Sequence, residues 1–221
     1  MMAMDEGALD RKWGVSLVRR QRALQGANRL FARVYHHVDV RSRNPLPAKG
    51  PAILVCNHTS GLDPQLIQGC CNRLITWLMA HEYYEVPFIK TILSTVGVIP
   101  LKRGARDIGA TRAALRALEA GQILGIFPEG KIETDGEILP FQTGVGLLAL
   151  KSRAPVYPVY LEGTQRGLEM KQAFLRRQHA VLTFGQPLRF TDQTLANGAV
   201  EHVTKLIEQA VRNLRHRVCK S

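Results

Sequence analysis

The chain has 221 residues, 45% of them hydrophobic, and a formal net charge of +12. This length favours one α/β domain with a sizeable core, and no Ser/Gly-rich linker divides it. The four cysteines form no CxxC pair, so the sequence predicts neither a zinc site nor a disulfide framework and favours a reducing, intracellular setting.

The excess positive charge lies near the amino terminus. Residues 11–43 hold nine Lys or Arg against one acid, Asp39. Apolar side chains recur among these charges at intervals of three and four residues, which predicts a basic amphipathic helix: Trp13, Leu17, Leu24, Ala27, Leu30, Phe31, Val34, Tyr35 and Val38. Such a helix can lie on anionic lipid, or it can pack on the domain with solvated arginines. Nucleic acid is disfavoured as a partner, because the sequence has no RNP-like aromatic motif and no zinc finger.

Membrane contact is expected to be interfacial. The first ten residues include the acids Asp5 and Glu6 and lack the apolar core of a secretory signal peptide. No window approaches the ~18 uninterrupted apolar residues that a membrane-spanning helix needs. We therefore expect a cytoplasmic protein that lies on a bilayer without crossing it.

After a Pro/Gly-rich break at 43–51, short apolar runs alternate with helical periodicity. The runs predict strands at 52–56, 74–79, 97–102, 122–127, 156–161 and 179–185. The periodic segments predict helices at 63–72, 107–119, 143–151 and 195–217. This alternation predicts a single α/β domain with a mostly parallel or mixed sheet covered by helices on both faces. Pro158 predicts that its strand is irregular or at an edge.

Common nucleotide and hydrolase motifs are missing from the sequence. There is no GxSxG, GxxxxGK[ST] or HExxH. The stretch GVGLLA at 144–149 formally matches GxGxxA, but it does not follow a strand. We interpret it as a helix whose small residues pack closely, and no dinucleotide site is predicted.

Polar residues follow the predicted strand 52–56 in the stretch NHTSGLD, residues 57–63. If a helix begins near Asp63, the loop can return this carboxylate to a ring nitrogen of His58 and orient the imidazole as a base. Alternatively, Asp63 caps the following helix, with Pro64 at its first position. The pair alone leaves both interpretations open.

Two other strand ends carry charged residues. The stretch IPLKRG supplies Lys102 and Arg103, and a guanidinium can grip a phosphate through two hydrogen bonds. The stretch IFPEGK places Glu129 and Gly130 in a turn. With His58, these residues predict a base, a phosphate anchor and a polar positioning group at the ends of three strands of one sheet.

Four blocks, NHTSGLD, GVIPLKR, FPEG and APVYPVYLEG, resemble the motifs of the 1-acylglycerol-3-phosphate acyltransferase family in order and spacing. The resemblance covers about residues 51–185. It implies an acyltransferase domain at 44–221, preceded by a membrane-associating segment at 1–43. It also implies a peripheral location on the cytoplasmic face of the inner membrane.

The resemblance further implies a reaction. A fatty acyl group would pass from acyl-CoA or acyl carrier protein to the hydroxyl of a lysophospholipid, most directly 1-acyl-sn-glycerol-3-phosphate, to give phosphatidic acid. No metal or other cofactor is implied. His58 would be the base and Asp63 its orienting partner. The acceptor and its phosphate would be bound by Arg103, Lys102, Glu129 and Gly130.

The sequence also departs from the family pattern. Lys131 follows FPEG where relatives often have Thr-Arg-Ser, Gln142 stands where a basic residue is common, and His81 stands near a frequent lysine. The acceptor can therefore be another lysolipid or hydroxylated compound, such as a lyso-ornithine lipid or a glycolipid. A third alternative is a basic lipid-binding protein without catalysis.

Overall fold

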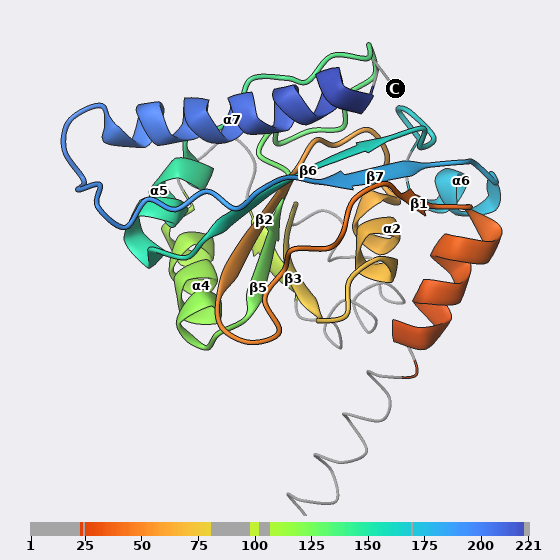
Figure 1. Ribbon diagram of the computed structural model, residues 1–221, viewed down its shortest axis with the longest axis horizontal. Coiled ribbons are helices and arrows are strands. Elements are labelled where there is room, and N and C mark those ends of the chain that lie inside the picture. Colours follow the sequence, from red (N-terminus) through yellow and green to blue (C-terminus); the bar gives the residue numbers. More distant parts are fainter. Residues whose placement is uncertain (1–22, 24, 81–97, 102–106, 169, 219–221) are drawn as a thin grey trace, which may run out of the picture.

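The computed structural model describes residues 23, 25–80, 98–101, 107–168 and 170–218. In this part of the chain, a seven-stranded sheet with the order β1-β7-β6-β2-β5-β3-β4 forms the centre (Figure 1). Neighbouring strands are parallel except for the antiparallel pair β6–β7. The strands are β1 (Asp39–Val40), β2 (Ala52–Cys56), β3 (Ile75–Ala80), β4 (Val98–Leu101), β5 (Ile123–Ile126), β6 (Val156–Glu162) and β7 (Val181–Phe184).

Helices cover both faces of the sheet (Figure 1). On one face, α4 (Ile108–Glu119), α5 (Gly144–Ser152) and α7 (Ala199–Val218) enclose one hydrophobic core. The other face is covered by α2 (Asp63–Gly69), α6 (Met170–Leu175) and a helix at 25–30 that continues into the π-helical turn η1 (Phe31–Tyr35). Every residue of β2 is buried, because its alternate side chains enter the two cores. The predicted α/β fold is confirmed.

Pro158 does not mark an edge strand, and this expectation is wrong. Strand β6 lies between β2 and β7. The β6–β7 ladder begins at the pair Val159–Phe184, and one residue further the Pro158 carbonyl accepts a hydrogen bond from Gly185 N at 2.8 Å. Proline therefore stands at the end of the antiparallel ladder, where its missing N–H costs a single bond.

Two short elements were not predicted: β1 and α6. Strand β1 lies within the segment 1–43 and pairs with β7, and η1 packs beside α2, where Ala32 is fully buried. The division of the chain at residue 43 stays a prediction. Among the described helices, none is long and apolar enough to cross a bilayer.

The GVGLLA stretch is helical and closely packed, as predicted. It forms most of α5, and Gly146 faces α7. A Cβ atom built on Gly146 would lie 2.4 Å from the Thr204 hydroxyl and 2.4 Å from the Val200 carbonyl oxygen. Only glycine lets the two helices approach this closely.

We predict that Gly146→Ala lowers the free energy of unfolding by about 1–3 kcal/mol, because the added methyl group separates α5 from α7. Gly144→Ala is the matched control in the same helix, since a Cβ there meets nothing within 4 Å. The control should leave stability unchanged or raise it by up to about 1 kcal/mol through helix propensity. Urea unfolding of both variants provides the measurement. Equal stabilities would contradict the close helix contact.

Candidate active site

His58 and Asp63 are brought together by the loop between β2 and α2. Asp63 is the first residue of α2 and is fully buried. Its Oδ2 atom lies 3.0 Å from His58 Nδ1 and accepts hydrogen bonds from the backbone N–H groups of Thr59 (2.8 Å) and Ser60 (2.9 Å). The carboxylate therefore points back into the loop. Asp63 does not act as the helix cap that the alternative interpretation assigned to it, since the N-cap is Leu62 and has no side-chain capping bond.

The imidazole of His58 is held in a defined orientation. Because the Asp63 carboxylate accepts from Nδ1–H, the other ring nitrogen, Nε2, is the one that can take a proton. The ring stacks on Phe127 with centroids 4.1 Å apart, and Phe127 stacks on Trp77 at 5.0 Å. The side chain is 17% exposed, so one edge of the ring reaches solvent.

His58 lines a cleft of about 670 Å³, a volume that includes the open space at its mouth. The rest of the wall is apolar on one side, where β3, β4 and β5 end, and has Lys131 on the other. The lining residues are His58, Gly61, Pro64, Trp77, Leu78, Met79, Ala80, Leu101, Phe127, Gly130 and Lys131. Such a cleft suits a ligand with a long apolar part and a polar or anionic end.

Glu129 is buried, with 4% of its surface exposed, and contacts the loop at 57–62, here called the catalytic loop because it carries the candidate base His58. Oε1 accepts from His58 N at 2.8 Å and Oε2 accepts from Leu139 N at 2.9 Å. Burial raises the pKa of this carboxyl to about 7, although the two N–H bonds favour the charged form. In the described structure, Glu129 thus connects the loop after β5 to the backbone of His58. The role in acceptor binding predicted for Glu129 remains untested.

Of the other predicted acceptor-binding residues, only Gly130 lies within the described part of the chain. Gly130 adopts a positive φ of 73° and lines the cleft beside His58. Lys102 and Arg103 lie outside the described residues, as does His81. Gln142 is exposed, and its backbone N–H bonds to Pro128 O at 2.8 Å.

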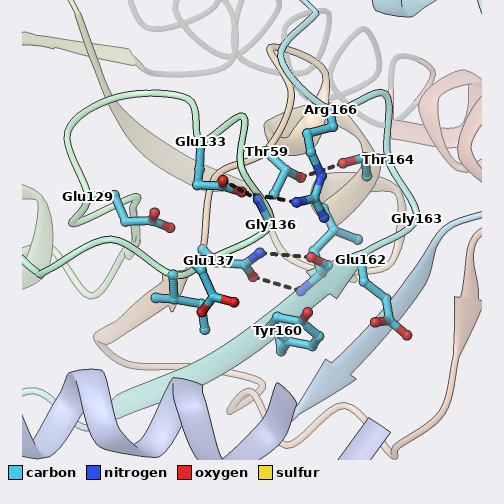
Figure 2. A pocket seen from close by; sticks show the side chains of 13 residues that line it. Thr59, Glu129, Glu133, Gly136, Glu137, Tyr160, Glu162, Gly163, Thr164 and Arg166 are labelled. Carbon is cyan, nitrogen blue, oxygen red and sulfur yellow. Dashed lines mark hydrogen bonds and ion pairs between the residues drawn. The ribbon is translucent and has the colours of Figure 1, made fainter. Parts of the chain in front are cut away.

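A second, polar pocket lies behind the catalytic loop (Figure 2). The Asn57 amide pairs with both backbone groups of Leu161, at 2.8 and 2.9 Å, and the hydroxyls of Thr59 and Thr164 are 2.5 Å apart. These contacts attach the loop to the end of β6. Sequence reasoning assigned no role to Asn57 or Thr59, because their partners are more than 100 residues away. The one local signal was an Asn directly after a buried strand.

Glutamates and one arginine line the far side of this pocket. Figure 2 shows Glu133 and Arg166 pointing toward each other, with the Arg166 guanidinium 3.5 Å from the Glu133 carboxylate. Glu133 also accepts a hydrogen bond from Gly136 N. Within the described ranges, no group of three His, Cys, Asp or Glu side chains is arranged to hold a metal ion. The polar side chains of this pocket support the loop between β2 and α2.

Comparison with known proteins identifies the family. A profile of the Acyltransferase family matches residues 37–162, more than half of the chain. The chain belongs to this acyltransferase family. The predicted family resemblance is confirmed.

Several relatives carry the name 1-acyl-sn-glycerol-3-phosphate acyltransferase. The Bacillus subtilis protein is 23% identical over 184 residues, which cover 82% of this chain and 89% of the relative. The Borreliella burgdorferi protein is 30% identical over 121 residues, which cover 54% of this chain and 48% of the relative. A chloroplast protein from Brassica napus is 28% identical over 133 residues, which cover 59% of this chain and 38% of the relative. The chain thus spans less than half the length of the last two.

A solved structure shows the same fold. The 1-acyl-sn-glycerophosphate acyltransferase from Thermotoga maritima superimposes with a TM-score of 0.68 at 20% identity, covering 92% of this chain and 88% of that protein. The mixed sheet with helices on both faces is therefore the architecture of a known acyltransferase.

The raised pKa of Glu129 predicts that stability depends on pH. The pKa of Glu129 is about 7 in the folded protein and near 4.5 ordinarily. Its contribution to the free energy of unfolding is therefore full below about pH 4.5 and is lost as the pH rises through about 7. The variant Glu129→Gln has no carboxyl group to titrate at this position, so its stability does not fall in this way as the pH rises. Its stability relative to wild type should therefore increase between about pH 4.5 and 7 and then level off, as measured by urea unfolding at a series of pH values. Parallel stability curves would show that Glu129 does not titrate in this range.

Proposed function

We propose that this protein is an O-acyltransferase that moves a fatty acyl group from a thioester, acyl-CoA or acyl carrier protein, to the hydroxyl of a lysophospholipid. The acceptor is 1-acyl-sn-glycerol-3-phosphate and the product is phosphatidic acid. The observation that carries the proposal is the Asp63-oriented imidazole of His58 at the wall of an apolar cleft. Family membership and the names of the relatives support the reaction class and the acceptor.

In this mechanism, His58 Nε2 takes the proton of the acceptor hydroxyl as the oxygen attacks the thioester carbonyl. A C–O bond forms, the carbonyl electrons move onto oxygen, and a tetrahedral intermediate results. When the C–S bond breaks, the sulfur leaves with the electron pair and receives the proton from His58. Asp63 stabilises the imidazolium between the two steps and keeps Nδ1 protonated. The substrate supplies the nucleophile, so no acyl-enzyme forms.

The acceptor's phosphate is held by positively charged side chains. Arg103 grips the phosphate with Lys102 beside it, while Gly130 lets the chain turn close to the substrate. Lys131 is exposed and lines the cleft with His58, so its ammonium group supplies a further cation where relatives often have Thr-Arg-Ser. This cation favours an anionic acceptor over a neutral glycolipid.

The enzyme works at the cytoplasmic face of the inner membrane, held there peripherally by the basic segment at 11–38. The described part of this segment supports the lipid interpretation. Packing on the domain would bury the apolar stripe, yet Leu30 is 64% and Val34 is 57% exposed. The part before residue 23 lies outside the described residues.

We predict that His58→Ala abolishes acyl transfer while the protein remains folded, because the proposed reaction then lacks its general base. Asp63→Asn should lower kcat by about 10² or more, since an amide cannot stabilise the imidazolium. Steady-state assays with a thioester donor and circular dichroism of each variant give the measurements. A folded His58→Ala protein with near-normal turnover would refute the mechanism.

The acceptor is tested by comparing lysophosphatidic acid with monoacylglycerol, which lacks the phosphate. Loss of a charge-assisted hydrogen bond worth roughly 1.5–3 kcal/mol should reduce kcat/KM for lysophosphatidic acid about tenfold to a hundredfold in Arg103→Ala. Arg103→Lys should lose less, and Lys131→Ala should reduce use of the same acceptor. Use of monoacylglycerol should change little in all three.

A wild-type preference for the neutral acceptor, or equal losses on both acceptors, would contradict the phosphate anchor. In that case the Lys131 and Gln142 departures would point to another acceptor, and a lyso-ornithine lipid and a glycolipid would be assayed in the same way.

A further inference from the structure

The helix at 25–35 and α6 are fastened to each other, although about 140 residues separate them in the chain. They lie side by side at one end of the molecule (Figure 1). Phe31 stacks on Phe174 with ring centroids 4.5 Å apart. The Tyr35 hydroxyl donates a hydrogen bond to the Leu175 carbonyl oxygen at 3.1 Å. The two helices therefore present a single joint surface.

This joint surface, here called the α6 patch, exposes large apolar side chains. Leu30 is 64% exposed and Val34 57%, while Phe174 is 50% and Leu175 76% exposed. The remaining exposed large hydrophobic residues in the described ranges, apart from Tyr35 of the same surface, come singly from separate segments: Ile108, Leu195 and Leu206. A cluster of this kind on a soluble surface indicates a contact that covers it.

The two segments that form the α6 patch carry charged side chains of one sign only. Residues 23–38 and 170–179 contain no Asp or Glu, and they contain Arg29, Arg33, Lys171, Arg176 and Arg177. The four arginines are exposed. Exposed apolar side chains in the same two segments as exposed guanidinium groups match the interface of an anionic bilayer, where the former enter the acyl boundary and the latter meet lipid phosphates. An acidic protein partner would account for the exposed arginines, but it would account less well for the exposed side chains of Leu175 and Phe174.

We infer that α6 and the helix at 25–35 form one docking surface for an anionic lipid bilayer, which Phe174 and Leu175 enter beside Leu30 and Val34. This inference rests on the proposed function, because the substrate is a membrane lipid. It extends the membrane contact from the N-terminal segment to an element in the second half of the acyltransferase domain.

The α6 patch is connected to the active site, so lipid docking and catalysis are linked. The loop that precedes α6 is hydrogen-bonded to the catalytic loop: Gly61 N donates to Leu168 O at 2.9 Å, and Gly167 N donates to Thr59 O at 2.8 Å. A bilayer that holds α6 therefore also holds the loop that carries His58 near the lipid interface.

The test uses the full chain and vesicles of phosphatidylcholine with or without phosphatidylglycerol, measured by sedimentation. Leu175→Asp should bind phosphatidylglycerol vesicles at least about tenfold more weakly than wild type, because it loses a buried leucine and gains a repelled charge. Leu195→Asp is the matched control: Leu195 is 55% exposed and lies in the segment leading into α7, whose first turn is at the opposite end of the molecule (Figure 1). The control should bind as wild type does.

Two charge reversals test the two helices separately. Arg33→Glu and Arg176→Glu should each weaken binding to phosphatidylglycerol vesicles and reduce its dependence on salt. These variants change exposed side chains only, so they remain informative if Leu175→Asp fails to fold by circular dichroism. An effect of Arg33→Glu without any effect of Arg176→Glu or Leu175→Asp would overturn the role of α6.

Other outcomes identify a different occupant and overturn the inference. Normal vesicle binding with loss of transfer from acyl carrier protein, but not from acyl-CoA, would assign the patch to a protein donor. A change of oligomeric state in Leu175→Asp would assign it to a second copy of the chain. Acyl transfer to detergent-dispersed lysolipid separates the two proposals: it should persist in Leu175→Asp, whereas its absence in wild type refutes the proposed reaction and leaves the vesicle measurement valid.

Discussion

The buried carboxylate of Asp63 is the constraint on which the site depends. Removing a carboxylate from water costs several kcal/mol, and this cost is offset here by three donors that meet one oxygen: the imidazole of His58 and the N–H groups of Thr59 and Ser60. All three donors come from the five residues that precede Asp63. The same interactions that stabilise the buried charge therefore also fix the ring of His58.

Contacts from distant parts of the chain hold this loop from outside. Asn57 fixes the end of β2 to β6, Glu129 reaches the backbone of His58 from the end of β5, and Thr59 meets Thr164 after β6. The strand order makes this possible, because β2 lies between β6 and β5 and its loop emerges between theirs. Parallel neighbours bring their carboxyl ends to one edge of the sheet, which is why three segments far apart in sequence meet at the loop that carries His58.

The sequence predicts those parts of the molecule whose signals are local. Continuous apolar runs identify β2, β5 and β6. The spacing of His58 and Asp63 allows their pairing, but on its own it left the helix-cap interpretation open. The short elements α6 and β1 carry no periodicity long enough to recognise, and Pro158 misleads because its position at the end of a ladder depends on tertiary pairing. The burial of Glu129 was equally hidden, since its two N–H donors belong to different loops, and nothing in FPEG says which way the carboxylate turns.

The catalytic loop separates two environments, and this arrangement suits chemistry between a lipid and a thioester. On one side His58 stacks on Phe127 and faces a largely apolar cleft, and on the other the loop rests on the polar pocket of Asn57, Glu129 and Thr164. Acyl chains can occupy the first without contacting the hydrogen bonds that hold the loop. The chain then runs from β6 through the loop at 163–168 into α6, so the polar support of the base is continuous with the proposed lipid-docking surface. In the proposed enzyme, binding at a bilayer and orientation of the base would thus depend on one segment of the chain, and a distortion of that segment would affect both.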